Sequence, residues 1–299
     1  MVRTVTEVEA VLTPSAGLAE GPVWDWTRQM LLWIDMDREE VYLSDIARGT
    51  SSTYGVGTAV GSVFLGEGSH VFVAGSDGLY DLDLDTGKSL RTFSLPLDAP
   101  RASMNDGEVD PIGRVWAGTM SADRSRADGA LYRFDRDGTL VVLPSVKLSN
   151  GLGWSPDQVL FYFVDSATQR IDVFDYDRLD GAIYSRRPFV TIPPEIGIPD
   201  GVAVDSEGCV WVAIWGGGMV HRYTPEGELD AIVKIPTPNV SSCCFGGRAF
   251  DTLFVTTSTR RLASCDPNVD GTIYACQPQA VGMPARRVQV TEPLRQEGI

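Results

Sequence analysis

Short apolar runs, each ended by glycine or charged residues, recur along the whole chain. Three of them are LFYFVD at 160–165, VWVAIW at 210–215 and LFVTTS at 253–258, all rich in β-branched and aromatic residues. Such runs are typical of strands, and turn-forming pairs such as Asp137-Gly138 separate them. No segment longer than about ten residues has the spacing of an amphipathic helix. The pattern predicts an all-β protein built from antiparallel strands.

The predicted strands group into repeated units. Each unit begins at a glycine and continues with two or three strands, and successive starts are 40 to 50 residues apart. The starts are Gly21, Gly61, Gly107, Gly151, Gly201 and Gly246. This period, with several strands per unit, is that of a β-propeller blade. We therefore predict a six-bladed β-propeller that forms a single domain over residues 1–299. We expect a strand near residues 7–14 to close the ring by pairing with one near 286–292.

Four of these starts place an oxygen-bearing side chain beside the central channel. Equivalent positions of a propeller's innermost strands lie at one depth, and here they hold Glu20, Asn105-Asp106, Asn150 and Asp200. Carboxylates gathered there repel one another unless a cation neutralises them. Carboxylate and amide oxygens are ligands suited to Ca²⁺, Mg²⁺ or Mn²⁺. Each Asp-Gly or Asn-Gly pair alone is an ordinary turn, but the repeated position predicts a divalent cation held by Glu20, Asn150 and Asp200.

The net charge and the cysteine content restrict which binding partners and which cellular compartment we expect. The formal charge of −15 argues against binding to nucleic acid or an anionic membrane surface, since both require a basic face. The first residues lack a signal-peptide pattern, and no apolar stretch is long enough to cross a bilayer. Five cysteines without a CxxC motif disfavour a disulfide framework and a zinc–cysteine site. We expect a cytoplasmic protein that is a monomer or a weak homo-oligomer.

Several motifs together resemble those of the SMP-30/gluconolactonase/regucalcin family. The motifs are AEGPVW (19–24), NDGEVDPIGRVWAGTM (105–120), SNGLGWSPD (149–157), FDYD (174–177), IPDGVAVDSEGCVWVA (198–213) and SSCCFGG (241–247). The resemblance runs from about residue 20 to about residue 257. It implies a six-bladed propeller that hydrolyses sugar lactones with one divalent metal in its channel (Ca²⁺, Zn²⁺, Mn²⁺, Mg²⁺ or Fe²⁺). It also implies Glu20, Asn150 and Asp200 as metal ligands, Asp200 as catalytic base or nucleophile, and Asn105 as a substrate contact.

The chain departs from the family pattern at two substrate-contacting positions. Several members carry an Arg two residues before the Asn of the NDG motif, where this chain has Ser103. Arg101, two residues earlier, is a candidate replacement. An acidic substrate contact after the GTM motif falls on Asp123, which is shorter than the Glu of some relatives. These departures leave the metal chemistry intact and leave the identity of the sugar open.

The sequence therefore predicts a metal-dependent lactonase for aldonolactones such as gluconolactone or pentonolactones. Two alternatives remain open on the same scaffold: a metal-dependent hydrolase of other esters or phosphotriesters, and a non-enzymatic calcium-binding propeller. A serine triad is not expected, because the chain has no G-x-S-x-G motif and only two histidines, His70 and His221, both in strand-like runs.

Overall fold

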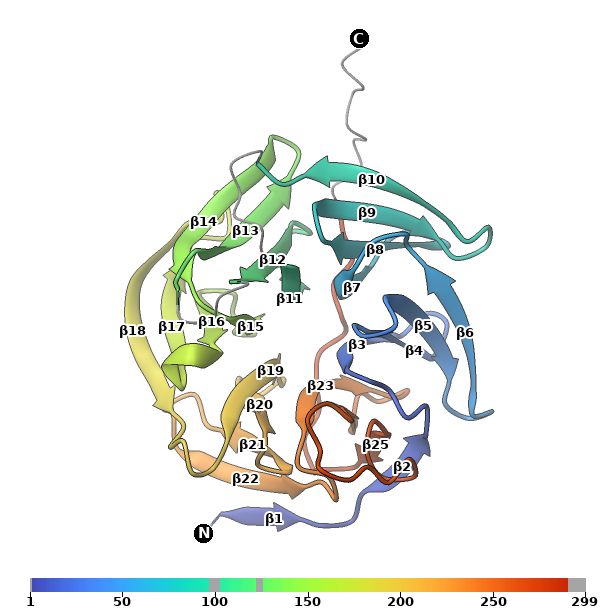
Figure 1. The fold of residues 1–299 in the computed structure, drawn as a ribbon. Coiled ribbons are helices and arrows are strands. Elements are labelled where there is room, and N and C mark those ends of the chain that lie inside the picture. The colour runs from blue at the N-terminus through green and yellow to red at the C-terminus, as the bar shows by residue number, and fades with distance from the viewer. Residues whose placement is uncertain (1, 97–102, 122–125, 290–299) are drawn as a thin grey trace.

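The structure, a computed structural model, describes residues 2–96, 103–121 and 126–289. Its strands form six sheets arranged as a ring around a central channel (Figure 1). Within the described ranges the only helix is the short 3₁₀ turn η1 (Ser166–Thr168), and no helix there is long and apolar enough to cross a membrane. The predicted all-β, six-bladed propeller is confirmed.

The innermost strand of each blade lies beside the channel, and the later strands lie progressively outward (Figure 1). Blade one contains β3 (Ala19–Asp25), β4 (Met30–Asp35), β5 (Glu40–Asp45) and β6 (Thr50–Gly55); blade two contains β7 (Val60–Leu65), β8 (His70–Gly75), β9 (Gly78–Asp83) and β10 (Lys88–Ser94). Blade three contains β11 (Ser103–Val109), β12 (Val115–Met120), β13 (Gly129–Asp135) and β14 (Gly138–Val146); blade four contains β15 (Ser149–Trp154), β16 (Leu160–Asp165), β17 (Arg170–Tyr176) and β18 (Ile183–Thr191). Blade five contains β19 (Ile198–Val204), β20 (Val210–Trp215), β21 (Met219–Tyr223), β22 (Leu229–Lys234) and β1 (Arg3–Val5); blade six contains β23 (Val240–Gly246), β24 (Thr252–Thr257), β25 (Ile273–Cys276) and β2 (Glu9–Leu12).

The ring closes through the N-terminus, but not with the expected partner. Strand β2 pairs antiparallel with β25, with Glu9 opposite Ala275, and so forms the outer strand of blade six. The prediction of a partner near residues 286–292 is wrong. All four residues of β25 are buried, and β2 covers the outer edge that this strand would otherwise leave unpaired. Strand β1 adds a second link, because it pairs in parallel with β22 of blade five.

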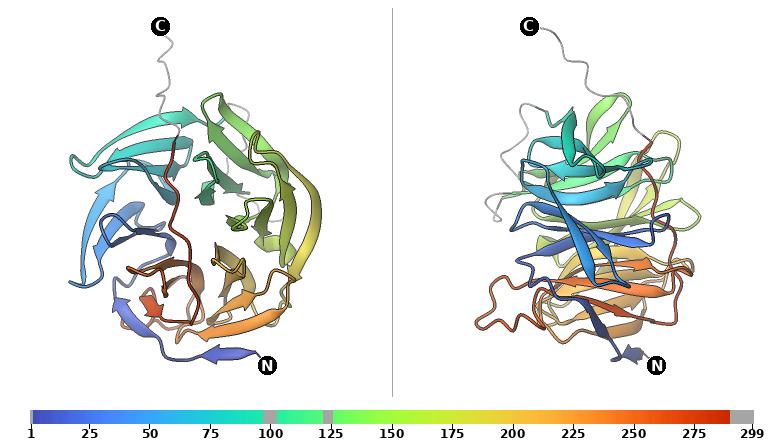
Figure 2. Two further views of the ribbon diagram at one scale, coloured as in Figure 1. Left: turned by 180° about the vertical axis from the view of Figure 1, so that it is seen from behind. Right: turned by 90° about the vertical axis from the view of Figure 1, so that its right-hand side faces the viewer.

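The C-terminal segment covers one end of the channel instead of closing the ring (Figure 2). Gly282 bridges to Asp205 of blade five, and Arg287 bridges to Leu65 of blade two. The Val288 N–H donates to the Leu65 carbonyl at 2.7 Å. Through these contacts, residues 282–288 connect blades on opposite sides of the ring at the end of the channel away from the candidate site.

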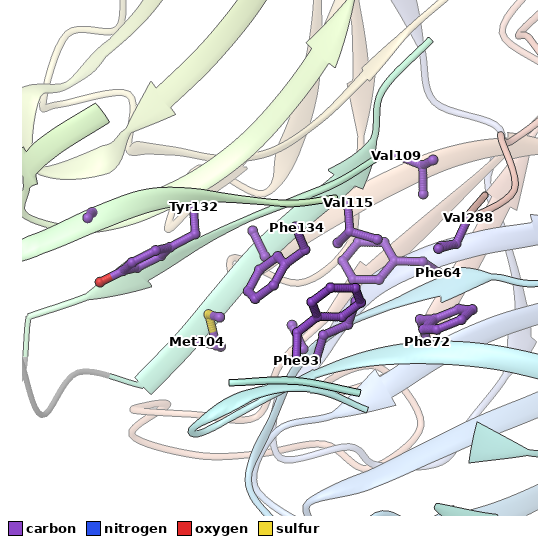
Figure 3. Packing of buried hydrophobic residues seen from close by; sticks show 13 residues of the cluster. Phe64, Phe72, Phe93, Met104, Val109, Val115, Tyr132, Phe134 and Val288 are labelled. Carbon is purple, nitrogen blue, oxygen red and sulfur yellow. The ribbon is translucent and has the colours of Figure 1, made fainter. Parts of the chain in front are cut away.

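Aromatic and aliphatic side chains fill the spaces between neighbouring blades. Between blades two and three, Phe64 and Phe72 pack with Tyr132 and Phe134, and all four are at most 5% exposed (Figure 3). Burying each ring of this size contributes about 1.5–3 kcal/mol. Val288 of the C-terminal segment joins the same cluster, so this segment is part of the packed core.

A buried aspartate follows the inner strand of blade five and connects it to the rest of the blade. Asp205 is 0% exposed and accepts hydrogen bonds from the N–H groups of Glu207 and Cys209, both at 3.0 Å. It also accepts from Trp211 Nε1 and Arg222 Nε, both at 2.9 Å. Asp110 accepts the equivalent bonds in blade three, including one from Trp116 Nε1 at 3.1 Å. These carboxylates are structural, because turn amides and buried side chains surround them.

Candidate functional site

A cavity of about 110 Å³ lies at the end of the channel opposite the C-terminal segment. Four of the five polar residues singled out in the repeats line it, namely Glu20, Asn105, Asn150 and Asp200, whereas Asp106 lines a second cavity deeper in the channel. The four come from the inner strands β3, β11, β15 and β19, and each is between 5% and 8% exposed. The repeat position thus brings together side chains as much as 180 residues apart in the sequence.

A break in strand pairing accompanies each of these residues. In β19 the regular register stops at Pro199 and resumes at Val202, which leaves Asp200 and Gly201 unmatched by β20. Strands β11 and β15 have the same interruption at Asn105-Asp106 and at Asn150-Gly151, and β3 has it directly after Glu20. A β-bulge of this kind re-aims side chains and is common beside binding sites. The bulges therefore account for acids and amides at the channel within otherwise apolar strands.

The glycine after the polar residue allows neighbouring blades to approach closely at this depth. A Cβ atom on Gly151 would lie 2.4 Å from the Val202 nitrogen and 2.7 Å from the Asp200 carbonyl oxygen. A Cβ atom on Gly201 would lie 2.8 Å from the Ser242 Cα. Since these contacts are with backbone atoms, a side chain at either position would displace an inner strand. The acid–glycine and amide–glycine pairs thus combine a polar side chain with a close backbone approach.

The two carboxylates of the cavity interact unfavourably with each other. Burial, together with the charges of Asp200 and Asp106, raises the pKa of Glu20 well above its ordinary value. The Gly21 N–H, which donates to Glu20 Oε2 at 3.3 Å, and the Arg260 guanidinium act in the opposite direction. Carboxyl groups whose pKa is raised by burial and by neighbouring negative charges are typical of functional sites. A cation bound between them can relieve the repulsion.

A chain of hydrogen bonds fixes the two amide side chains. Asn105 Nδ2 donates to the Ser149 carbonyl at 2.6 Å and to Asn150 Oδ1 at 2.9 Å. Asn150 Nδ2 donates to Ser166 Oγ at 2.8 Å, and Ser166 Oγ donates to the Pro199 carbonyl at 2.6 Å. Both hydrogens of the Asn105 amide are therefore used within the protein, and its Oδ1 is the atom left to meet a ligand. A substrate contact by Asn105 would therefore be made through Oδ1, because its amide nitrogen is engaged with blade four.

The sequence reasoning missed several residues of the cavity wall that follow the second strand of a blade. Because the second strand is antiparallel to the first, its end lies at the same end of the channel as the start of the first. Ser166 follows β16, and Arg260 and Arg261 follow β24; all three line the cavity. Attention to the segment after each second strand, as well as to each acid–glycine pair, could have identified them.

The remaining predicted substrate contacts lie at the edge of what the structure describes. Ser103 begins β11 opposite Met120, and Met120 lines the cavity while Ser103 is not among the described lining residues. Arg101 and Asp123 lie outside the described residues. The cavity therefore brings together Glu20, Asn105, Asn150 and Asp200 but leaves the role of the other three predicted contacts to experiment.

Two further groups of acidic side chains lie outside this cavity. Asp205, Glu207 and Cys209 place their ligand atoms within 4.8 Å of one another. Arg222 already neutralises this group, with Nη2 2.7 Å from Asp205 and 2.5 Å from Glu207. Deeper in the channel, beside the C-terminal segment, Asp106 and Glu108 line a second cavity of about 100 Å³. Burial raises the pKa of Asp106 to about 7 and also raises that of Glu108.

Glu20→Gln is expected to stabilise the metal-stripped protein while weakening its ability to bind a cation. The raised pKa of Glu20 makes the folded chain hold a proton that the unfolded chain releases, so the parent loses stability as pH rises above about 4.5. The glutamine side chain does not titrate, so the variant does not lose stability in this way as pH rises. We expect its Tm at neutral pH to rise by roughly 2–4 °C, the shift that about 1 kcal/mol produces in a protein of comparable size.

Thermal unfolding of both metal-stripped proteins across pH 5 to pH 8 measures this effect. Glu39→Gln, at an exposed turn position, is the matched control and is expected to follow the parent. A Glu20→Gln curve with the parent's pH dependence would contradict the electrostatic account of this carboxylate.

Comparison with known proteins relates the fold and the cavity to one family. The sequence profile of the SMP-30/Gluconolactonase/LRE-like region matches residues 18–259. Regucalcin of Gallus gallus is 36% identical over 287 residues, which cover 93% of each chain. The putative sugar lactone lactonase YvrE of Bacillus subtilis (strain 168) is 32% identical over 251 residues, which cover 83% of this chain and 85% of that protein.

A solved structure shares the architecture closely. The calcium-binding protein regucalcin from Agrobacterium tumefaciens superimposes with a TM-score of 0.91, at 23% identity, over 97% of this chain and 100% of that chain. With the family profile over most of the propeller and curated relatives above 30% identity over almost the full length, this chain belongs to the SMP-30/gluconolactonase/LRE-like family.

Proposed function

We propose that this protein hydrolyses sugar lactones to the open-chain aldonic acids in a reaction that depends on a divalent metal. The observation that carries the proposal is the convergence of Glu20, Asn150 and Asp200 on one small cavity at the channel end. A family relative from Bacillus subtilis, named as a putative sugar lactone lactonase, supports the choice of substrate class. The cavity of about 110 Å³ suits a small molecule rather than a polymer.

The residues present fit a divalent cation. The donor set consists of two buried carboxylates and one amide oxygen, all hard ligands. Burial first, and then the charges of Asp200 and Asp106, raise the pKa of Glu20, and a cation would offset both effects. Asn105 and Ser166 hold Asn150 through both ends of its amide, which is how outer residues orient a metal ligand. Glu20, Asn150 and Asp200 would hold the ion, and Ca²⁺, Mg²⁺, Mn²⁺, Zn²⁺ and Fe²⁺ are the candidates.

Lactone hydrolysis requires attack on the ring carbonyl, stabilisation of the developing oxyanion and protonation of the ring oxygen. A divalent cation bound here would supply Lewis-acid stabilisation of the oxyanion. Asp200, buried at the cavity wall, would accept a proton from an attacking water as general base. Its carboxylate could instead attack the carbonyl carbon and break the bond to the ring oxygen, which leaves as a hydroxyl; the resulting mixed anhydride is then hydrolysed by water. Asn105 Oδ1 is available to accept a hydrogen bond from a sugar hydroxyl.

The test is pH-monitored hydrolysis of γ- and δ-aldonolactones by metal-stripped protein, repeated after each candidate ion is restored singly. We expect turnover to disappear on stripping and to return with one of the ions. Hydrolysis that persists in fully stripped protein would remove the metal from the proposal. No hydrolysis of any lactone, with a cation still bound, would favour either of the other two functions. Turnover of aryl esters or phosphotriesters by the same loaded protein would then identify a different hydrolase, and its absence a calcium-binding propeller.

A further inference from the structure

The part of the cavity wall that blade six forms, between the blades of Asp200 and Glu20, contains two arginines. Arg260 and Arg261 follow β24 in blade six and line the same cavity as Glu20 and Asp200. Arg260 is close enough to lower the pKa of Glu20, so its charge acts inside the cavity. With a divalent cation offsetting the two carboxylates, and with Asp37 paired to Arg260, the charge of Arg261 is left in excess at this wall. This local sign is opposite to that of the whole chain, whose formal charge is −15.

The protein holds the Arg260 backbone and side chain in place from three directions. The buried Asn239 donates from Nδ2 to the Arg260 carbonyl at 2.7 Å, and Ser258 Oγ accepts from the Arg260 N–H at 3.0 Å. Asp37 of blade one accepts from Arg260 Nε at 2.9 Å and 3.0 Å, and also from Nη2. A guanidinium fixed in this way is preorganised, so little conformational entropy is lost when it binds an anion.

Arg261 is exposed and has φ of 58°, a left-handed conformation that a non-glycine residue adopts at some cost. The exposed turn residue Glu39 has the same conformation, so the positive φ identifies a turn at Arg261 and is not by itself evidence of a ligand. The turn therefore presents two adjacent guanidinium groups at one cavity wall.

From this arrangement we propose that Arg260 and Arg261 form an anion-binding wall, so that the preferred lactones carry an anionic group away from the ring carbonyl. The ring carbonyl would lie toward Glu20, Asn150 and Asp200, and the anionic group would meet the arginines. Arginine suits this role because its planar fork forms paired, charge-assisted hydrogen bonds with a carboxylate or a phosphate. The inference rests on the proposed lactonase function and specifies its substrate class.

A purely structural role for Arg260 is the competing explanation. The Arg260 and Asp37 side chains are 35% and 39% exposed, and ion pairs this exposed contribute little to stability. An ion pair that served only to link blades one and six would not require a second arginine on the cavity side. It would also make Asp37 and Arg260 equivalent in every assay, and this equivalence can be tested.

The experiment compares three lactones with the metal-restored protein: glucono-γ-lactone as the neutral form, glucaro-γ-lactone with a carboxylate, and a phosphorylated gluconolactone. We expect kcat/KM for one of the anionic lactones to exceed that of the neutral one by about tenfold, with the advantage shrinking at high salt. The anionic lactone with the higher kcat/KM shows whether the wall prefers a carboxylate or a phosphate. Arg260→Gln and Arg261→Gln are each expected to lower the anionic-to-neutral ratio about tenfold, mainly through KM.

Arg48→Gln, which removes a side chain 80% exposed on blade one, is the matched control and should leave the ratio at the parental value. Calorimetric binding of glucarate and gluconate gives a second readout without turnover, and Arg260→Gln should weaken glucarate more. Asp37→Asn should keep most of the anionic preference, since Arg261 is untouched and Asn239 and Ser258 still hold the Arg260 backbone. Equal losses in Asp37→Asn and Arg260→Gln on neutral and anionic lactones would overturn the inference while leaving the lactonase intact. Absence of hydrolysis with every lactone would instead refute the proposed function.

Discussion

Asp200→Asn is expected to reduce lactone turnover by about 10²- to 10⁴-fold, the range that a positioned general base contributes. Asparagine has nearly the same size and keeps one oxygen toward the cavity, so the bulge at Asp200-Gly201 should remain. It can neither accept the proton of an attacking water nor attack the carbonyl carbon as a carboxylate. It also removes one of the two negative charges available to a cation. Steady-state kinetics with saturating metal, together with calorimetric measurement of metal affinity, separates these two losses.

Asp137→Asn is the matched control, because Asp137 lies in an exposed turn of blade three. It should retain parental turnover and metal affinity. Near-parental turnover in Asp200→Asn would show that the catalytic assignment is wrong. Single-turnover hydrolysis in ¹⁸O-labelled water distinguishes the two roles of the parent carboxylate. Label appearing in Asp200 after hydrolysis identifies the nucleophile, because a general base gains no oxygen from water; label confined to the product, with no mixed anhydride trapped by hydroxylamine, identifies the general base.

Asp205→Ala is expected to cause the largest loss of stability among the substitutions considered, about 3–5 kcal/mol. The change leaves Arg222, whose side chain is 7% exposed, without its buried carboxylate partner. It also leaves Trp211 Nε1 and the Cys209 N–H without an acceptor inside blade five. Arg222 keeps only its partly exposed partners Glu207 and Asp230, and unsatisfied buried donors are among the most destabilising lesions in a folded protein. Chemical denaturation of parent and variant measures the difference.

Glu207→Ala tests whether this effect belongs to the buried carboxylate. Glu207 contacts the same guanidinium at 2.5 Å, but its side chain is 70% exposed. Removing it should therefore cost under about 1 kcal/mol. A loss of similar size in both variants would show that Asp205 acts as one partner of a surface network and does not organise the blade.

The sequence predicted more of the fold than of the site. The six repeats could be recognised in the sequence because each blade contains an acid–glycine or similar start, short apolar runs and polar turns. Each of these features depends only on residues that are close together in the chain. The partner of the N-terminal strand was predicted incorrectly. Both β25 and residues 286–292 follow the last repeat, and no local pattern tells which has the buried, unpaired edge. Residues 282–288 instead cross the channel and pack Val288 between blades two and three.

For the site, the sequence by itself determined which inner-strand positions face the channel, because equivalent positions in a closed ring must meet at one depth. Glu20, Asn105, Asn150 and Asp200 were identified from that rule alone. Only the tertiary structure decided that both hydrogens of the Asn105 amide are used by blade four, since hydrogen-bond direction depends on side-chain geometry. Only it placed Arg260 beside Glu20, 240 residues away. The repeat in the sequence predicts where each inner strand begins. The loop residues that follow a second strand have no such repeat, and only the folding of the ring brings them to the cavity.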